Sequence, residues 1–108
     1  MTAARIETSV ADGSMRIALS GEIDLANAAA VEEEIREAVS HQPTTVSVDL
    51  TDLTYMDSAG VRILFALASQ LQALRIVLEL IVPPDSPTRR LVELSGFESL
   101  AALRPRSH

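Results

Sequence analysis

An acid, a hydroxyl group and a glycine stand together in the stretch YMDSAGVRIL, residues 55–64. A strand-like apolar segment precedes them and a helix-like apolar segment follows them. A serine at the start of a helix is a favourable place for a phosphate, because free backbone N–H groups and the helix dipole both attract negative charge. Phosphorylation of Ser58 would add about −1.5 to −2 charges beside Asp57. The pattern therefore favours a charge switch over a catalytic site.

A purely structural interpretation of these residues stays open. Asp24 and Ser58 both belong to the residue types that cap the N-termini of helices. Gly60 would let the first turn of the helix pack closely against the preceding strand. Short motifs of this kind have low specificity, so the residues alone do not decide between capping and phosphorylation.

The residue types that most enzymes need are scarce in this chain. It has no cysteine and no lysine, and both P-loops and Schiff-base enzymes require a lysine. A Ser-His-Asp triad would have to use His41 or the terminal His108, and Ser58 does not lie in a G-x-S-x-G motif. Two histidines without cysteine also make a His/Cys zinc site untenable. We therefore expect a protein that is not an enzyme and that has no metal and no cofactor.

The charge and hydropathy of the chain limit the classes of partner and the cellular location that we expect for it. A net charge of −6 argues against a nucleic-acid surface, which is basic, and against an anionic membrane surface. No segment has about 18 or more uninterrupted apolar residues, and the N-terminus does not resemble a signal peptide. We expect a cytoplasmic protein that binds neither nucleic acid nor membrane.

The chain reads as one domain in which strands and helices alternate. We assign residues 1–108 to a single domain, with an ordered core of about 4–103 and a polar C-terminal tail at 104–108. Asp12-Gly13 is typical of a hairpin turn, which would make the first two strands antiparallel. Hydrophobic periodicity predicts strands at 5–10, 15–23, 46–50 and 75–82, and helices at 24–40, 58–74 and 88–95.

The first predicted helix illustrates the pattern. Asp24 is placed to be its N-cap, and one apolar stripe at helical spacing includes Leu25, Ala28, Val31 and Ile35. Alternation of strands and helices favours right-handed crossovers between parallel strands. The carboxyl ends of such strands share one edge of the sheet, where ligands tend to bind. The spacing therefore predicts that Asp24, Asp57 and Ser58 form one polar patch.

Three stretches of the sequence carry a resemblance to a known family. The stretch VSVDLTDLTYMDSAGVRILFAL, residues 46–67, resembles the STAS domain of anti-sigma factor antagonists, which carry a D-S-[SA]-G motif here. LSGEIDLANA, residues 19–28, is similar to the family's G-E-x-D element, and PTRRLVELSGFESL, residues 87–100, to its closing helix and turn. The resemblance implies an α/β STAS fold, in which a mixed, mostly parallel sheet of four to five strands packs against helices.

The resemblance also implies a mechanism. Such antagonists bind an anti-sigma factor that is a serine kinase of the GHKL ATPase type, and so release a sigma factor in stress-response or sporulation signalling. The kinase phosphorylates the serine that corresponds to Ser58, the phosphorylated form dissociates, and a PP2C-type phosphatase restores it. Mg and ATP belong to the kinase, so no cofactor is implied for this chain. The residues implied in partner binding are Asp24, Asp57, Ser58, Ala59, Gly60, Arg62 and Ile63.

The sequence departs from the family at one point of the motif. Where the family often has a small apolar run after the glycine, this chain has Val61-Arg62-Ile63-Leu64. We expect Arg62 to be exposed, and either to pair with Asp57 or to face a partner. STAS domains also serve as scaffolds or as subunits of transport or signalling complexes, in which the serine is not phosphorylated. That alternative function stays open.

Overall fold

A five-stranded sheet forms the centre of the molecule in the computed structural model, which describes residues 3–105. The strand order is β1-β2-β3-β4-β5; β1 and β2 are antiparallel, and the other neighbours are parallel. The predicted α/β fold with a mostly parallel sheet is therefore confirmed. In chain order the elements are β1 (Ala4–Ala11), β2 (Ser14–Ile23), α1 (Ala28–Val39), β3 (Thr45–Met56), α2 (Ser58–Ala73), β4 (Val77–Ile81), α3 (Pro87–Leu94), the 3-10 helix η1 (Phe97–Ser99) and β5 (Ala102–Arg104).

Two predicted boundaries were wrong. The strand expected at 46–50 extends through Met56, because the rest of β3 pairs with the second half of β2 across two irregularities in register. The first helix begins at Ala28 and not at Asp24, because residues 24–27 form a turn. As a result Leu25, which was assigned to the apolar stripe of this helix, has 79% of its surface exposed.

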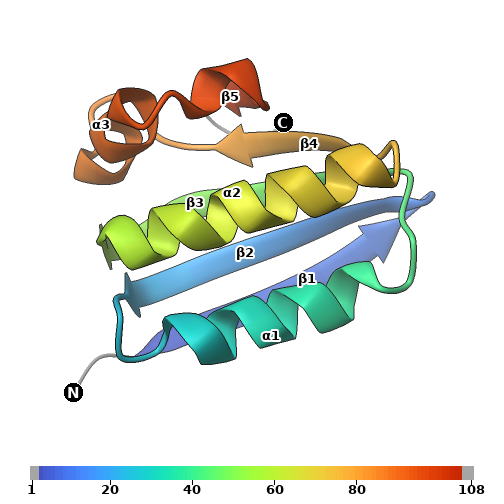
Figure 1. Ribbon diagram of the computed structural model, residues 1–108, viewed down its shortest axis with the longest axis horizontal. Helices are drawn as coiled ribbons and strands as arrows, with labels where there is room; N and C mark the ends of the chain where they lie inside the picture. The colour runs from blue at the N-terminus through green and yellow to red at the C-terminus, as the bar shows by residue number, and fades with distance from the viewer. Residues whose placement is uncertain (1–2, 106–108) are drawn as a thin grey trace.

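Helices α1 and α2 lie side by side over the same face of the sheet, as Figure 1 shows. The core fills the space between the two layers, and it is aliphatic apart from one aromatic contact. Phe97 is fully buried and meets the ring of Phe65 edge to face, with centroids 5.1 Å apart, which ties η1 to α2. Other side chains of this core with at most 2% of their surface exposed include Ile17, Leu19, Ile35, Val48, Leu50, Leu64, Leu71 and Leu80.

Ion pairs join neighbouring strands on the opposite face of the sheet. Arg16 on β2 forms an ion pair with Asp49 on β3, and Arg104 on β5 forms one with Glu79 on β4 at 2.7 Å. Burial alone would raise the pKa of Asp49, but hydrogen bonds from Thr51 and Arg16 outweigh it and hold the pKa below 3.8. Asp49 is therefore buried and charged, and it lies on the face of the sheet that α1 and α2 do not cover.

Candidate functional site

Two parallel strands end side by side and bring the predicted acidic residues to one edge. Ile23, the last residue of β2, pairs with Met56, the last residue of β3. The backbone N–H of Asp57 then donates a hydrogen bond to the carbonyl of Ile23 at 3.2 Å. Asp24 directly follows β2, and Asp57 directly follows β3. The two residues therefore begin neighbouring turns at the same edge of the sheet. In Figure 1 this edge also holds the start of α2.

The pairing of β2 with β3 is irregular at this edge, because Thr54 is an extra residue on β3. The pairing with β3 shifts in register between Gly21 and Glu22. Gly21 has φ +88, and a Cβ there would lie 2.4 Å from the carbonyl oxygen of Ala3. Glycine is the residue that accepts both the left-handed conformation and the close backbone approach. Gly21 of the G-E-x-D element thus has a backbone conformation and a close contact with Ala3 that require glycine.

Asp57, and not Ser58, is the N-cap of α2. The backbone of Asp57 is extended, and its Oδ1 accepts a hydrogen bond from the N–H of Ala59 at 2.9 Å. Ser58 is the first helical residue, and its hydroxyl makes no hydrogen bond with the residues from 3 to 105. The interpretation of Ser58 as a cap was wrong, because the preceding carboxylate performs that role. The side chain of Ser58 is exposed at the start of the helix.

Asp24 organises a turn and does not cap α1. Its Oδ1 accepts a hydrogen bond from the N–H of Ala26 at 2.9 Å, and its own N–H donates to Oδ1 of Asn27 at 3.0 Å. Asn27 is the N-cap position of α1 but makes no capping hydrogen bond through its side chain, which instead donates to the carbonyl of Glu22 at 2.8 Å. The turn is held at both ends, so the half-buried Asp24 has a defined position.

The remaining predicted partner-binding residues divide by burial. Three of them are buried beneath the first turns of α2: Ala59, Gly60 and Ile63. They support the surface from below and contribute little exposed area to it. A Cβ on Gly60 would lie 2.2 Å from Cγ of Met56, so the expected close packing of this turn is present. Arg62 is exposed, as expected, but the ion pair with Asp57 is absent from the described part of the chain.

Two apolar side chains at the same edge were missed. Leu25, in the turn after β2, is 79% exposed, and Tyr55, near the end of β3, is 50% exposed. Tyr55 pairs with Glu22 across the two strands, so it lies beside the G-E-x-D element. The signal available in the sequence was the polar pair Asp24 and Asn27 around Leu25, which was outweighed by the helical spacing of Leu25 from Ala28.

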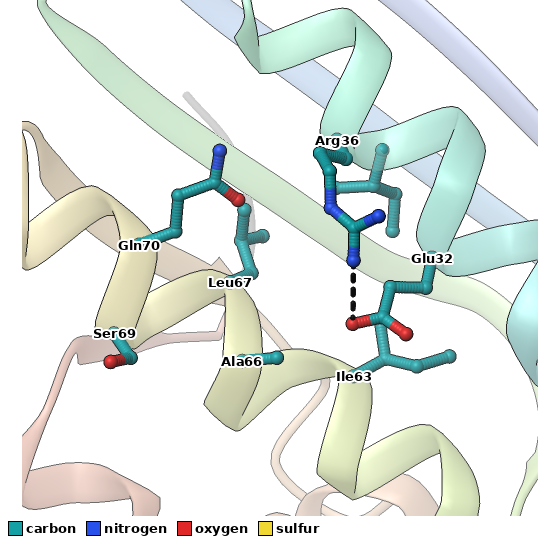
Figure 2. Close-up of a pocket in the computed structure, with 8 residues that line it drawn as sticks. Glu32, Arg36, Ile63, Ala66, Leu67, Ser69 and Gln70 are labelled. Atoms are coloured by element: carbon teal, nitrogen blue, oxygen red, sulfur yellow. Dashed lines mark ion pairs between the residues drawn. The ribbon is translucent and has the colours of Figure 1, made fainter.

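A groove runs between α1 and α2, as Figure 2 shows. Its volume is about 320 Å³, and Ile35, Ile63 and Leu67 line it together with polar side chains. On the α1 side, Arg36 and Glu32 form an ion pair at 3.3 Å. Ile63 is the one predicted partner-binding residue that lines this groove.

The described part of the chain contains neither a candidate metal site nor a membrane-spanning helix. Among residues 3–105 there is no group of three or more His, Cys, Asp or Glu side chains that could hold a metal ion. Within the same residues, no helix is both long enough and apolar enough to cross a membrane.

Comparison with known proteins identifies the family. Residues 6–105 match the family described as "Mlab, STAS domain", and the chain belongs to this STAS domain family. It is 36% identical over 96 residues to the anti-sigma-F factor antagonist RsfB of Mycobacterium tuberculosis, covering 86% of this chain and 76% of that protein. The resemblance inferred from residues 19–28, 46–67 and 87–100 is confirmed at the level of the family.

Solved structures agree. The chain is similar to an anti-sigma factor antagonist from Mycobacterium paratuberculosis, with a TM-score of 0.86 and 27% identity over 95% of this chain and 86% of that one. It is also similar to the unphosphorylated form of the anti-sigma factor antagonist SpoIIAA, with a TM-score of 0.73 and 25% identity over 97% and 90% of the two chains.

Proposed function

We propose that this protein is an anti-sigma factor antagonist whose partner is an anti-sigma factor with serine kinase activity of the GHKL ATPase type. The unphosphorylated protein binds the anti-sigma factor and thereby releases a sigma factor. Phosphorylation of Ser58 ends this binding, and a PP2C-type phosphatase restores it. Because transcription in bacteria takes place in the cytoplasm, the proposal places the protein there.

The observation that carries the proposal is the exposed Ser58 hydroxyl beside an already satisfied helix cap. Asp57 accepts the hydrogen bond from Ala59, so the hydroxyl of Ser58 has no structural role among residues 3–105. A kinase can therefore reach and modify it without disturbing the cap. Relatives support the choice of partner: RsfB is named an anti-sigma-F factor antagonist, and SpoIIAA has also been solved in a phosphorylated form, similar to this chain with a TM-score of 0.66.

The physical effect of a phosphate at this position is local. It adds about −1.5 to −2 charges next to the Asp57 carboxylate and on the same edge as Asp24. A partner that had covered Ser58 would then have to bury a phosphate whose charge of about −1.5 to −2 a single cation does not neutralise, which costs several kcal/mol. The exposed apolar side chains of Leu25 and Tyr55 on this edge are consistent with a surface that a protein partner covers.

The test is phosphorylation by purified candidate kinases. Anti-sigma factors from the host are incubated with the protein and ATP, and the added mass is mapped by mass spectrometry. We expect one phosphate, on Ser58, and none on the Ser58→Ala variant. Ser69→Ala is the matched control, because Ser69 is an exposed serine of the same helix, and this variant should be labelled like the wild type.

The same experiment separates this function from the alternative. A scaffold or a subunit of a transport or signalling complex would bind its partner without modification of Ser58. Full labelling of Ser58→Ala, or complexes with anti-sigma factors that never lead to labelling at residue 58, would reject the proposed switch.

A further inference from the structure

Arg62 lies one helical turn after Ser58 on α2, and both side chains are exposed. Residues four apart in a helix have neighbouring side chains, about 5–6 Å apart at their Cβ atoms. An acidic group at the N-terminal position and a basic group four residues later is the favourable order for an ion pair. Ser58 and Arg62 have this spacing and this order once the serine carries a phosphate.

Acidic side chains at the start of α2 and across the groove have other partners and form no ion pair with Arg62 in the described part of the chain. Asp57 uses its Oδ1 to cap α2, and Asp24 uses its Oδ1 in the turn after β2. Glu32, the acidic residue of α1 that faces Ile63 across the groove, is paired with Arg36 at 3.3 Å, as Figure 2 shows. None of the ion pairs formed among residues 3–105 includes Arg62. Its guanidinium group is therefore an exposed cation without a fixed counter-ion in the described part of the chain.

We propose that Arg62 is the counter-ion of phosphorylated Ser58, and that the two side chains form an ion pair along the surface of α2. This inference rests on the proposed function and adds a residue to its regulation. A planar guanidinium group can donate two parallel hydrogen bonds to phosphate oxygens, which adds a defined geometry to the attraction between the charges.

The pair has a consequence for the switch. In the unphosphorylated protein, Arg62 is free to contact a partner on the same face of α2. In the phosphorylated protein, the phosphate holds it, so modification changes two side chains of the surface at once. An aspartate at position 58 has a shorter reach and a single charge, so it engages Arg62 less than a phosphate does.

The test uses the full chain with phosphoserine installed at position 58 during translation, so that it does not depend on any kinase. The phosphate is titrated by ³¹P NMR in the otherwise unchanged chain, in Arg62→Gln, in Arg62→Lys and in Arg90→Gln. Arg90 is the control, because it is an exposed arginine on α3 and forms no ion pair with the residues that the structure describes. Asp24 and Asp57 act on the phosphate equally in all four proteins.

A nearby cation favours the doubly charged phosphate, so the second pKa of the phosphate, ordinarily about 6, should be lower with Arg62 than with glutamine. The expected difference is about 0.3, as for other helical ion pairs. It should be partly kept in Arg62→Lys, unchanged in Arg90→Gln, and lost in about 1 M NaCl, where the Debye length is about 3 Å. The proposed ion pair would be overturned if the phosphate had the same second pKa in Arg62→Gln as in the unchanged chain. It would also be overturned if this pKa rose as much in Arg90→Gln as in Arg62→Gln. A kinase that fails to label Ser58 would instead overturn the proposed function.

Discussion

Gly60 and Met56 are packed so closely that a Cβ on residue 60 would lie 2.2 Å from Cγ and 2.8 Å from Sδ of the methionine. Met56 is the last residue of β3, and Gly60 belongs to the first turn of α2. The contact therefore sets how the start of the helix sits on the end of the strand. Ser58 lies between the two residues, so its position depends on this contact.

Gly60→Ala is expected to lower the free energy of unfolding by about 1–3 kcal/mol, the range for an added methyl group in a packed core. Urea denaturation measures this change in the free energy of unfolding. The cost should be clearly smaller in a Met56→Ala background, because the clashing side chain is then absent. An equal cost in both backgrounds would show that Met56 is not the cause. Ser69→Ala, at an exposed position of α2, should leave the stability nearly unchanged.

Asp49→Asn is expected to destabilise the fold at neutral pH and to lose its effect in acid. The asparagine can still accept the hydrogen bond from Thr51, but the ion pair with Arg16 is lost, at a cost of about 1–2 kcal/mol. Because the folded protein lowers the pKa of Asp49, the charged carboxylate contributes stability above the unfolded value near 3.8. That contribution disappears as the pH falls through the lower folded pKa.

The measurement is the free energy of unfolding of both proteins between pH 7 and pH 3. The two curves should approach each other as the pH falls below the unfolded value near 3.8. Glu79→Gln is the matched control, because the ion pair of Glu79 with Arg104 on the same face is more exposed and should be worth less than about 1 kcal/mol. A difference for Asp49→Asn that stays constant with pH would contradict the role of its charge.

The alternation of strands and helices was sufficient to predict the fold and the shared edge, because parallel strands joined by helices necessarily end on the same side. Local details at that edge were not predictable. The apolar periodicity of Leu25, Val31 and Ile35 extends the predicted helix back to residue 24. Residues 24–27 nevertheless form a turn, which side-chain hydrogen bonds of Asp24 and Asn27 hold in place. Periodicity reports which side chains would share a face, and it does not report where the helix begins.

Interactions between residues far apart in the chain could not be predicted from the sequence either. Arg16 and Asp49 are 33 residues apart, and their ion pair arises from the register of β2 and β3, which the sequence pattern does not specify. The choice of Asp57 over Ser58 as the cap is a matter of one residue, within the usual uncertainty of a helix boundary. The candidate site and the exposure of Arg62 were therefore predicted from residue type and place, and the exposure of Ser58 came from the structure.

Asp24→Asn should weaken binding of the anti-sigma factor more than it weakens folding. Asparagine can still accept the hydrogen bond from Ala26, so the stability should change by about 1 kcal/mol or less. Affinity, measured by titration calorimetry, should fall by about fivefold or more if the charge contacts the partner. Asp12→Asn changes the net charge equally in the hairpin turn after β1 and should bind like the wild type. Unchanged binding by Asp24→Asn would limit Asp24 to holding the turn.

Ser58→Asp should keep the fold and lose part of the binding. A negative charge in the first turn of α2 gains about 0.3–1 kcal/mol from the helix dipole, and repulsion from the neighbouring Asp57 offsets a similar amount at an exposed position. The melting temperature should therefore stay close to that of the wild type. Ser69→Asp adds the same charge farther along α2 and controls for net charge. A Ser58→Asp variant that melts far below the wild type would contradict a purely local switch.

The most direct test of the switch is the affinity of one anti-sigma factor for the unphosphorylated protein and for the protein phosphorylated at Ser58, measured by titration calorimetry under the same conditions. The phosphate carries more charge than Arg62 alone can neutralise, so its burial at the interface predicts a loss of at least tenfold in affinity, or about 1.4 kcal/mol. Ser58→Asp should lie between the two forms, because it carries less charge. Equal affinities for the phosphorylated and unphosphorylated proteins would contradict the proposed function.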